Sequence, residues 1–252
     1  MSPKNDLPKN WPTSVPYLRT PIYSKALTPL QYTALRTKPK DTLHVPLSTP
    51  LGPCVDVRIT PILNPLHPAN GQSGLFALRD LPPGSFILPY IGEIHETSEE
   101  KYAKSDYDLS IDREADLAVD ASRCGNEARF VNDFRGVPAQ RVTGGGVGGG
   151  KDVGKSGKDG KLSKEEQGKA IVNAEFREVW DGRPGRGERC MCVWVLPAGK
   201  SGKGKGIKKG EEILVSYGRG FWGARMGGDG KGEVDWEAEY QKRQDEERNK
   251  EG

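Results

Sequence analysis

The chain is short of the residues that build metal clusters and disulfide frameworks. It has four cysteines and three histidines in 252 residues. The cysteines lie at positions where no two of them form a C-x-x-C pair, and the histidines are scattered: Cys54, Cys124, Cys190, Cys192, His44, His67 and His95. A structural zinc site needs four ligands, so we expect no bound metal, and no disulfide framework can be read from this spacing. The sequence predicts a reduced, intracellular protein.

Long hydrophobic runs and a strong net charge are also missing. No apolar segment is long enough for a signal peptide or a membrane span. The formal net charge is only +3, too small to indicate direct nucleic-acid binding. Hydrophobic residues make up 34 % of the chain, beside 33 Gly and 19 Pro. Low-complexity tracts account for this composition, and the remainder is long enough to form a core.

Composition divides the chain into three parts. Residues 1–53 form a Pro-rich N-terminal arm, either packed on the domain as an extended segment or partly disordered. Residues 54–222 form the main domain, with Gly/Lys-rich insertions at 141–169 and 199–206 that contain too few apolar residues to fold and are predicted to be disordered. Residues 223–252 form a charged tail that we predict to be helical.

Short segments of alternating or β-branched residues dominate the main domain, which predicts a mostly β fold. Cys190 and Cys192 alternate on one such segment and therefore point to one face of a strand. Two strand cysteines are the simpler interpretation, and half of a metal site is the alternative. The predicted strands are 55–63, 74–79, 85–95, 107–112, 117–120, 171–180, 189–196 and 213–217, with short helices at 24–36 and 97–104.

The stretch 120–134, Asp-Ala-Ser-Arg-Cys-Gly-Asn-Glu-Ala-Arg-Phe-Val-Asn-Asp-Phe, carries the most functional information. Asp120 can cap a short helix, and Gly125 can end the turn before the next segment. Asn132 follows an apolar pair, which indicates a polar side chain delivered into the interior. An unpaired buried amide costs about 1–3 kcal/mol, so Asn132 needs partners, either protein or ligand.

Two further stretches decide the interpretation. Residues 71–93 contain Gly-Gln-Ser-Gly-Leu-Phe and then Tyr-Ile-Gly-Glu, and residues 207–222 contain Gly-Glu-Glu-Ile-Leu-Val-Ser-Tyr and end in Phe-Trp. Together with Asn132, and in this order, they resemble the SET-domain protein lysine methyltransferases over roughly residues 55–222. The resemblance implies the SET fold of small curved sheets, few short helices and a C-terminal pseudoknot. The cysteine clusters that flank many histone-directed members are absent here.

The resemblance implies an S-adenosylmethionine-dependent transfer of a methyl group to a lysine of a protein substrate, histone or non-histone, and a nuclear rather than cytoplasmic location. A catalytically inactive SET-fold binding or adaptor module is the alternative, because the residues after Asn132, which are Asp133, Phe134 and Arg135, depart from the family motif. A basic nucleic-acid adaptor that uses the Lys/Gly tracts is a third interpretation. We expect neither a metal nor a membrane partner.

The chemistry requires a narrow apolar tunnel that desolvates the lysine amine and aligns it with the methyl donor. Tyrosine suits the wall of such a tunnel, since its ring is apolar and its hydroxyl orients an amine without adding charge. Tyr217 matches the tyrosine that closes the last family motif and is the first catalytic candidate. Tyr107 is the second, while a packing role is as consistent with Tyr90 as a catalytic one.

For the methyl donor, Gly74 allows a close backbone approach and Leu75 and Phe76 supply main-chain contacts. The carboxamide of Asn132 would accept from the donor's ammonium, and Trp222 would stack on adenine or act as a hydrophobic lid. The predicted cofactor-binding residues are Gly74, Leu75, Phe76, Arg129, Phe130, Asn132, Asp133, Tyr217 and Trp222.

Overall fold

The computed structural model describes residues 7–138, 171–199 and 204–218. It divides the chain into two units, Met1–Ser216 and Tyr217–Gly252, and only Tyr217 and Gly218 of the second unit are described. The predicted insertion at 141–169 and the predicted helical tail at 223–252 therefore lie outside the described residues, as does the middle of the second insertion.

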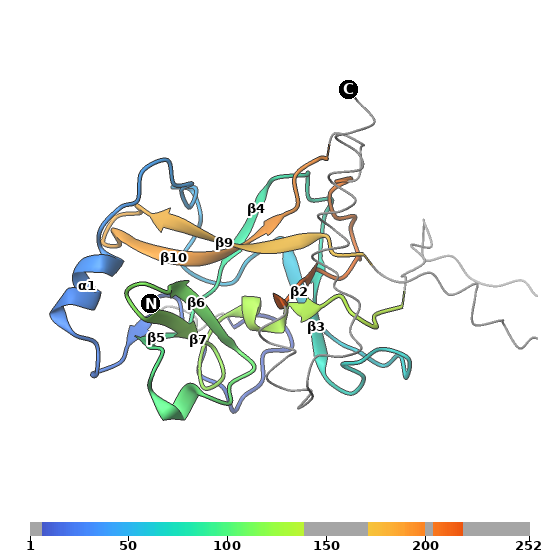
Figure 1. Ribbon diagram of the computed structural model, residues 1–252. Helices are drawn as coiled ribbons and strands as arrows, with labels where there is room; N and C mark the ends of the chain where they lie inside the picture. The colour runs from blue at the N-terminus through green and yellow to red at the C-terminus, as the bar shows by residue number, and fades with distance from the viewer. Residues whose placement is uncertain (1–6, 139–170, 200–203, 219–252) are drawn as a thin grey trace, which may run out of the picture. The chain divides into compact units, whose positions relative to one another are not determined.

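Small sheets make up the first unit, which confirms the mostly β prediction (Figure 1). The largest has four strands in the order β1 (Ile22–Tyr23), β5 (Glu93–Glu96), β7 (Leu117–Asp120) and β6 (Asp108–Asp112). A second sheet has the order β4 (Phe86–Pro89), β10 (Glu188–Val195) and β9 (Ala174–Asp181). Two pairs complete the set: β2 (Val57–Pro61) with β3 (Ser73–Ala77), and β8 (Asn132–Asp133) with β11 (Leu214–Val215).

The helices in the described residues are short. They are α1 (Pro29–Leu35) and two 3-10 turns, η1 (Glu100–Tyr102) and η2 (Glu127–Phe130). The prediction of a helix over residues 97–104 was wrong except for the single turn η1. Tyr102 is drawn inward at its end and stacks on the His95 ring, with 3.5 Å between the ring centroids. Asp120, predicted to cap a helix, ends β7 and accepts from the backbone N–H of Ser122 in a turn at 3.0 Å.

The single long strand predicted at 85–95 is in fact two strands in different sheets. β4 pairs with β10, whereas β5 pairs with β1 and β7. The chain crosses between the sheets at Tyr90–Gly92. A Cβ atom at Gly92 would collide with the carbonyl of Asp120, so the close approach at this crossing requires glycine. Continuous hydrophobicity does not reveal such a crossing, because both sheets bury this segment.

Residues of the N-terminal arm contact the 120–134 stretch. Trp11 is buried and makes edge-to-face contacts with Tyr17 and Phe130, at centroid distances of 5.0 and 5.7 Å. Its indole N–H donates to the carbonyl of Val15 at 2.6 Å. Tyr17 forms a backbone bridge with Gly125. The arm therefore supports the back of the 120–134 stretch.

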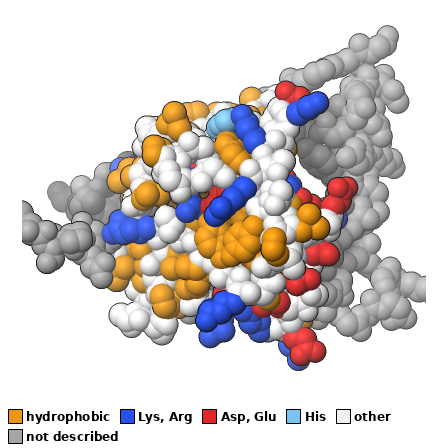
Figure 2. Space-filling model, turned by 90° about the vertical axis from the view of Figure 1, so that its left-hand side faces the viewer, with side chains coloured by type: hydrophobic (Ala, Val, Ile, Leu, Met, Phe, Trp, Pro, Cys, Tyr) orange, Lys and Arg blue, Asp and Glu red, His pale blue; other side chains and the backbone are white. Residues whose placement is uncertain are grey.

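Helix α1 begins at a capping box. The Thr28 hydroxyl accepts from the backbone N–H of Gln31, and the Gln31 side chain accepts from the backbone N–H of Thr28. The helix buries Leu35 completely and leaves Leu30 78 % exposed. Figure 2 views the unit from the side on which α1 lies and shows apolar side chains gathered on this face, with Lys and Arg side chains around them.

The cysteine pair belongs to a hydrophobic cluster. Cys190 and Cys192 are buried on one face of β10 with their sulfur atoms 3.8 Å apart, and Val45 and Val179 share the cluster. This confirms the interpretation of two cysteines on one strand face. Burial raises the pKa of the Cys192 thiol well above its ordinary value, which keeps it protonated and unreactive.

His95 is a charged group inside the four-stranded sheet. It is fully buried, and its ring nitrogens lie 2.8 Å from the carbonyl oxygen of Glu96 and 2.9 Å from a carboxylate oxygen of Asp108. Both partners only accept, so both ring nitrogens donate and the ring is an imidazolium. Burial lowers the pKa of His95, but these hydrogen bonds and the charges of Asp108 and Asp120 outweigh burial and raise it above 6.5.

We predict that Trp11→Ala lowers the free energy of unfolding by about 3–5 kcal/mol, because it removes a buried aromatic ring from between Tyr17 and Phe130. Urea unfolding followed by circular dichroism measures the change. Leu30→Ala, on the exposed face of α1, is the control and should change stability by less than about 0.5 kcal/mol. Equal, small effects of the two variants would show that the arm does not support the domain.

We predict that stability falls as pH rises through the folded-state pKa of His95. Because that pKa is raised, the stabilisation is fully present below the unfolded value of about 6.5 and is lost at higher pH. Melting temperatures measured from pH 6 upward should decline in the wild type. His95→Gln should flatten this decline, whereas His44→Gln, at an exposed residue, should leave it unchanged. An identical slope in the wild type and His95→Gln would contradict the prediction.

Candidate functional site

Asn132 stands where a 3-10 turn passes into a short parallel strand pair. The turn η2 ends at Phe130 and is followed by the buried Val131. Asn132 then pairs with Leu214 across β8 and β11. The side chain is half-buried, as expected for a polar group delivered inward. Its Nδ2 donates to Oε1 of Glu212 at 2.8 Å and to the carbonyl of Ser73 at 3.4 Å. In the part of the chain that the structure describes, no hydrogen bond reaches Oδ1.

Glu212 is the partner that binds Asn132 most closely. Its residue is 2 % exposed, and its backbone forms an antiparallel bridge with Phe76 of β3. The second carboxylate oxygen, Oε2, lies 3.1 Å from Nε2 of His67. The carboxylate therefore joins β3, the β8–β11 pair and the loop between β2 and β3.

The tautomer of His67 follows from its other contact. The backbone N–H of Ala69 donates to Nδ1 of His67 at 2.9 Å. A backbone N–H only donates, so Nδ1 is unprotonated and the ring carries its proton on Nε2. That proton is donated to Glu212. The histidine is 6 % exposed and reaches this position from a tight turn, in which its own N–H bonds the carbonyl of Asn64 at 3.0 Å.

Gly74 completes the group. A Cβ atom at this position would collide with Oε1 of Glu212 and lie 3.1 Å from Nδ2 of Asn132. Only glycine leaves room for the two polar side chains beside the backbone of β3. We call His67, Gly74, Asn132 and Glu212 the Asn132 cluster. It joins two of the predicted site residues, Gly74 and Asn132, to two residues that were not predicted.

Leu75 and Phe76 follow Gly74 in β3, as predicted. Leu75 is buried, and its carbonyl accepts from the backbone N–H of Ile213 at 2.8 Å. Phe76 is half-buried. Asp133 is turned away toward Arg135, whose guanidinium donates to its carboxylate at 2.7 Å. Their roles as cofactor-binding residues stay predictions.

Arg129, Phe130 and Tyr107 form a second group around the same stretch. Arg129 donates to the carbonyls of Ala121 and Ser122 at 2.9 and 3.2 Å. Its guanidinium lies 4.4 Å from the centre of the Tyr107 ring and 5.1 Å from that of Phe130. Arg129 thus links two parts of the 120–130 loop and packs them against the aromatic residues. This structural role is separate from any contact with a ligand.

Tyr90 and Tyr107 differ in the use of their hydroxyls. The Tyr90 hydroxyl donates to the carbonyl of Tyr107 at 2.7 Å, and its buried ring packs edge-to-face on Phe176. This geometry favours the packing role for Tyr90. Tyr107 is half-buried, and within the described residues its hydroxyl forms no hydrogen bond, so it stays a tunnel candidate.

The remaining predicted residues belong to the second unit. Tyr217 is its first residue and is half-buried. Trp222 lies outside the described residues. The predicted catalytic role of Tyr217 and the predicted stacking role of Trp222 therefore stay predictions.

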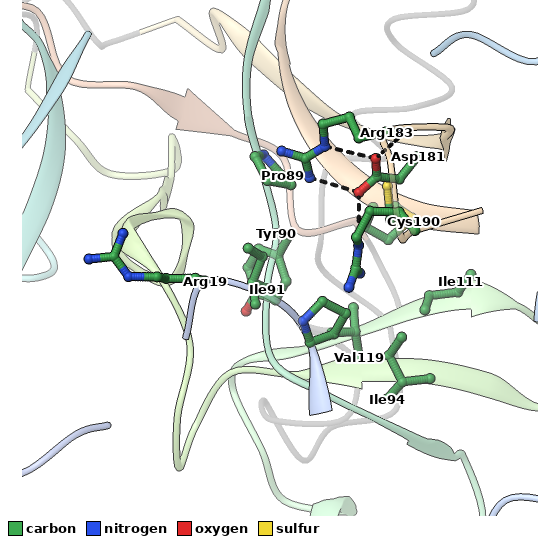
Figure 3. A pocket seen from close by; sticks show the side chains of 13 residues that line it. Arg19, Pro89, Tyr90, Ile91, Ile94, Ile111, Val119, Asp181, Arg183 and Cys190 are labelled. Carbon is green, nitrogen blue, oxygen red and sulfur yellow. Dashed lines mark hydrogen bonds and ion pairs between the residues drawn. The ribbon is translucent and has the colours of Figure 1, made fainter. Parts of the chain in front are cut away.

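Three of the cavities among the described residues have walls that include none of the predicted site residues. The one in Figure 3 has a volume of about 10 Å³, room for one water at most. Its wall contains Asp181, held by two hydrogen bonds from Arg183 at 2.8 and 2.7 Å (Figure 3). A cavity of about 350 Å³ contains Cys54 and Glu127, and an open one of about 480 Å³ is formed by the arm.

Burial raises the pKa of two groups in the wall of the second cavity, Cys54 and Glu127. It raises the pKa of the Cys54 thiol to about 11. It also raises the pKa of Glu127, although hydrogen bonds from the Cys54 backbone and the Tyr17 hydroxyl oppose the shift. No group of three or more metal-binding side chains occurs in the described residues, and no helix among them is long and apolar enough to cross a membrane.

Comparison with known proteins agrees with this geometry. Residues 72–135 match the SET domain family model. The matched segment contains Gly74, Tyr107 and Asn132, whereas His67 and Glu212 of the Asn132 cluster fall outside it.

Two curated relatives are histone-lysine N-methyltransferases by name. SUVR4 of Arabidopsis thaliana is 38 % identical over 76 residues, which cover 23 % of this chain and 15 % of the relative. EHMT1 of Homo sapiens is 36 % identical over 62 residues, which cover 23 % of this chain and 5 % of the relative. The chain thus spans only a small part of the length of these relatives.

Among solved structures, ATXR5 in complex with histone H3.1 mono-methylated on R26 has a TM-score of 0.48 at 13 % identity, covering 81 % of both chains. The Polycomb Repressive Complex 2 of Chaetomium thermophilum bound to S-adenosylmethionine has a TM-score of 0.40 at 19 % identity, covering 67 % of this chain and 16 % of that chain.

We predict that Asn132→Ala lowers the free energy of unfolding by about 1–3 kcal/mol without ligand, because the buried Glu212 carboxylate loses a donor. If Asn132 also binds the donor's ammonium, S-adenosylmethionine affinity falls about ten- to a hundredfold. Thermal unfolding and isothermal titration calorimetry measure the two effects, with exposed Asn70→Ala as the control. A folded variant with wild-type affinity would remove Asn132 from the cofactor site.

Proposed function

We propose that the protein is an S-adenosylmethionine-dependent protein-lysine N-methyltransferase. The observation that carries the proposal is the orientation of the Asn132 amide: Nδ2 is bound to Glu212, and no hydrogen bond within the described residues reaches Oδ1. Asn132 lies in the segment that matches the SET domain family model, and Glu212 comes later in the chain, just before β11. The curated relatives, although matched over short segments, support the reaction class by name.

The residues present fit the methyl donor. Oδ1 of Asn132 would accept from the ammonium of the methionyl end, while Gly74 leaves room for the Glu212 carboxylate that holds Nδ2. Leu75 and Phe76 continue the same strand and offer main-chain contacts. When bound, S-adenosylmethionine supplies a methyl group on a positively charged sulfur, which leaves as a neutral thioether once the lysine nitrogen has taken the methyl.

The lysine side requires a different environment. Only the neutral amine is nucleophilic, and its reference pKa of about 10.4 makes it scarce at neutral pH. Desolvation in an apolar channel lowers that pKa, and alignment of amine and methyl carbon contributes several kcal/mol. Tyr107 in the first unit and Tyr217 in the second are each a candidate to orient the amine, because a tyrosine hydroxyl does so without adding charge.

The substrate we propose is a lysine of a protein, histone or non-histone. The histone class is supported by the names of the curated relatives, and a nuclear location would follow from it. We propose no metal and no direct contact with nucleic acid, since the chain's net charge of +3 gives little attraction to phosphates.

The competing function is an inactive SET-fold binding module. Isothermal titration with S-adenosylmethionine and a labelled-methyl assay against histones and a cell lysate distinguish the two. The enzyme must bind the donor and transfer label to protein. A module that binds the donor without transfer, or binds no donor, would contradict the proposed activity.

We predict that Tyr217→Phe lowers kcat for methyl transfer by roughly a hundredfold, in line with the loss of an oriented catalytic hydroxyl. The affinity for S-adenosylmethionine should stay near the wild-type value, because the hydroxyl contacts the amine and not the donor. Steady-state methylation and titration calorimetry measure the two quantities. Tyr32→Phe, in α1, is the control. Unchanged turnover in Tyr217→Phe would remove Tyr217 from the active site.

A further inference from the structure

We propose that Glu212 and His67 are positioning residues that hold the Asn132 amide with its oxygen toward the ammonium of the methyl donor. The inference rests on the proposed function, since it assigns an action to two residues of the same site. Neither residue belongs to the sequence-predicted site, and neither lies in the segment that matches the family model. The two act through Asn132.

An asparagine amide has two ends of similar size and opposite polarity. A half-turn about the last side-chain bond exchanges Oδ1 with Nδ2, and only the surrounding hydrogen bonds decide between the two orientations. A site for an ammonium ligand needs the oxygen outward. In the flipped orientation the NH2 group would face the ligand's own N–H donors, and affinity would be lost.

Glu212 decides the orientation of Asn132. An ionised carboxylate only accepts, and its Oε1 lies 2.8 Å from Nδ2. The flipped amide would bring Oδ1 against this negative oxygen. The carbonyl of Ser73, at 3.4 Å, is a second acceptor on the same side, so both neighbours require the NH2 group there. The amide oxygen then has to point to the other side.

His67 holds the carboxylate in turn. Its proton is fixed on Nε2 by the backbone N–H of Ala69, so the ring donates to Oε2 of Glu212 at 3.1 Å. With Oε2 occupied by His67, Oε1 faces Asn132. The ring itself is held in its turn, where the N–H of Asn70 bonds the carbonyl of His67 at 2.9 Å. Each group fixes the next.

The backbone of Glu212 is fixed from both sides. The N–H of Ile213 donates to the carbonyl of Leu75, and the N–H of Ala77 donates to the carbonyl of Glu211, at 2.8 and 2.9 Å. The Asn173 side chain donates to the carbonyl of Glu212 at 2.8 Å. The strand that carries Gly74 therefore also sets the place of the carboxylate. A small shift of Glu212 would therefore change the orientation of the Asn132 amide beside Gly74.

The inference predicts a loss that depends on the ammonium of the ligand. Glu212→Gln offers one acceptor oxygen to two donors, so it satisfies either Asn132 or His67 but not both. The affinity for S-adenosylmethionine and for S-adenosylhomocysteine, which both carry the ammonium, should fall roughly tenfold. The affinity for 5′-methylthioadenosine, which lacks the amino-acid end, should stay at the wild-type value.

His67 supplies the second variant. His67→Ala should weaken the two ammonium ligands by roughly threefold, since the carboxylate keeps its bond to Asn132 but loses its restraint. His67→Gln, which can still donate to Glu212, should recover part of that affinity. Glu188→Gln is the matched control: Glu188 is another 2 % exposed glutamate, and its carboxylate is bound by Tyr23 and Arg186. It should lower the melting temperature without changing any of the three affinities.

Titration calorimetry on the full chain, with the three ligands and each variant, tests the inference. A loss confined to the two ammonium ligands supports it. An equal loss for all three ligands, as a purely structural role would give, overturns it, as does an unchanged affinity in folded Glu212→Gln. If Glu212→Gln does not fold, His67→Ala decides in its place: its affinity for the two ammonium ligands should fall while its affinity for 5′-methylthioadenosine stays unchanged. Failure of the wild type to bind S-adenosylmethionine would contradict the proposed function itself.

Discussion

The buried carboxylate of Glu212 is the constraint on which the site depends. It lies in a region almost without solvent, so its oxygens must receive hydrogen bonds from the protein. Asn132 and His67 supply them from positions 80 and 145 residues away in the sequence. These hydrogen bonds hold β3, the β8–β11 pair and the loop after β2 next to one another. Gly74 lies there because no other residue leaves room.

The 120–134 stretch is held from two other directions. On one side Arg129 bonds two carbonyls of the preceding turn, and its guanidinium stacks near Tyr107. Trp11 of the arm packs edge-to-face on Phe130. A guanidinium that already has two carbonyl acceptors contributes to a ligand site by holding the loop. The arm and Arg129 thus hold the backbone that leads to Asn132 in place. An amide with one fixed orientation requires such support.

Local pattern was enough to place most strands, because each alternates or is β-branched over a short run. It also singled out Asn132, whose position after an apolar pair is a local signal. It failed at 85–95, where two sheets bury consecutive parts of one apolar run and only the collision at Gly92 marks the crossing. It also passed over Glu212 and His67. Both lie in polar, turn-like sequence, and their burial depends on partners far along the chain.

The energetic character of the Asn132 cluster argues for orientation over stability. Burying a carboxylate costs several kcal/mol of solvation, which hydrogen bonds offset only in part, and apolar residues of similar volume are often as stabilising or more so. A core built for stability alone would therefore fill this place with apolar side chains. What the polar cluster adds is direction, because each donor and acceptor fixes the next and the chain of contacts ends at one amide oxygen. A charged ligand group benefits from such direction, since its partner is already aligned when it arrives.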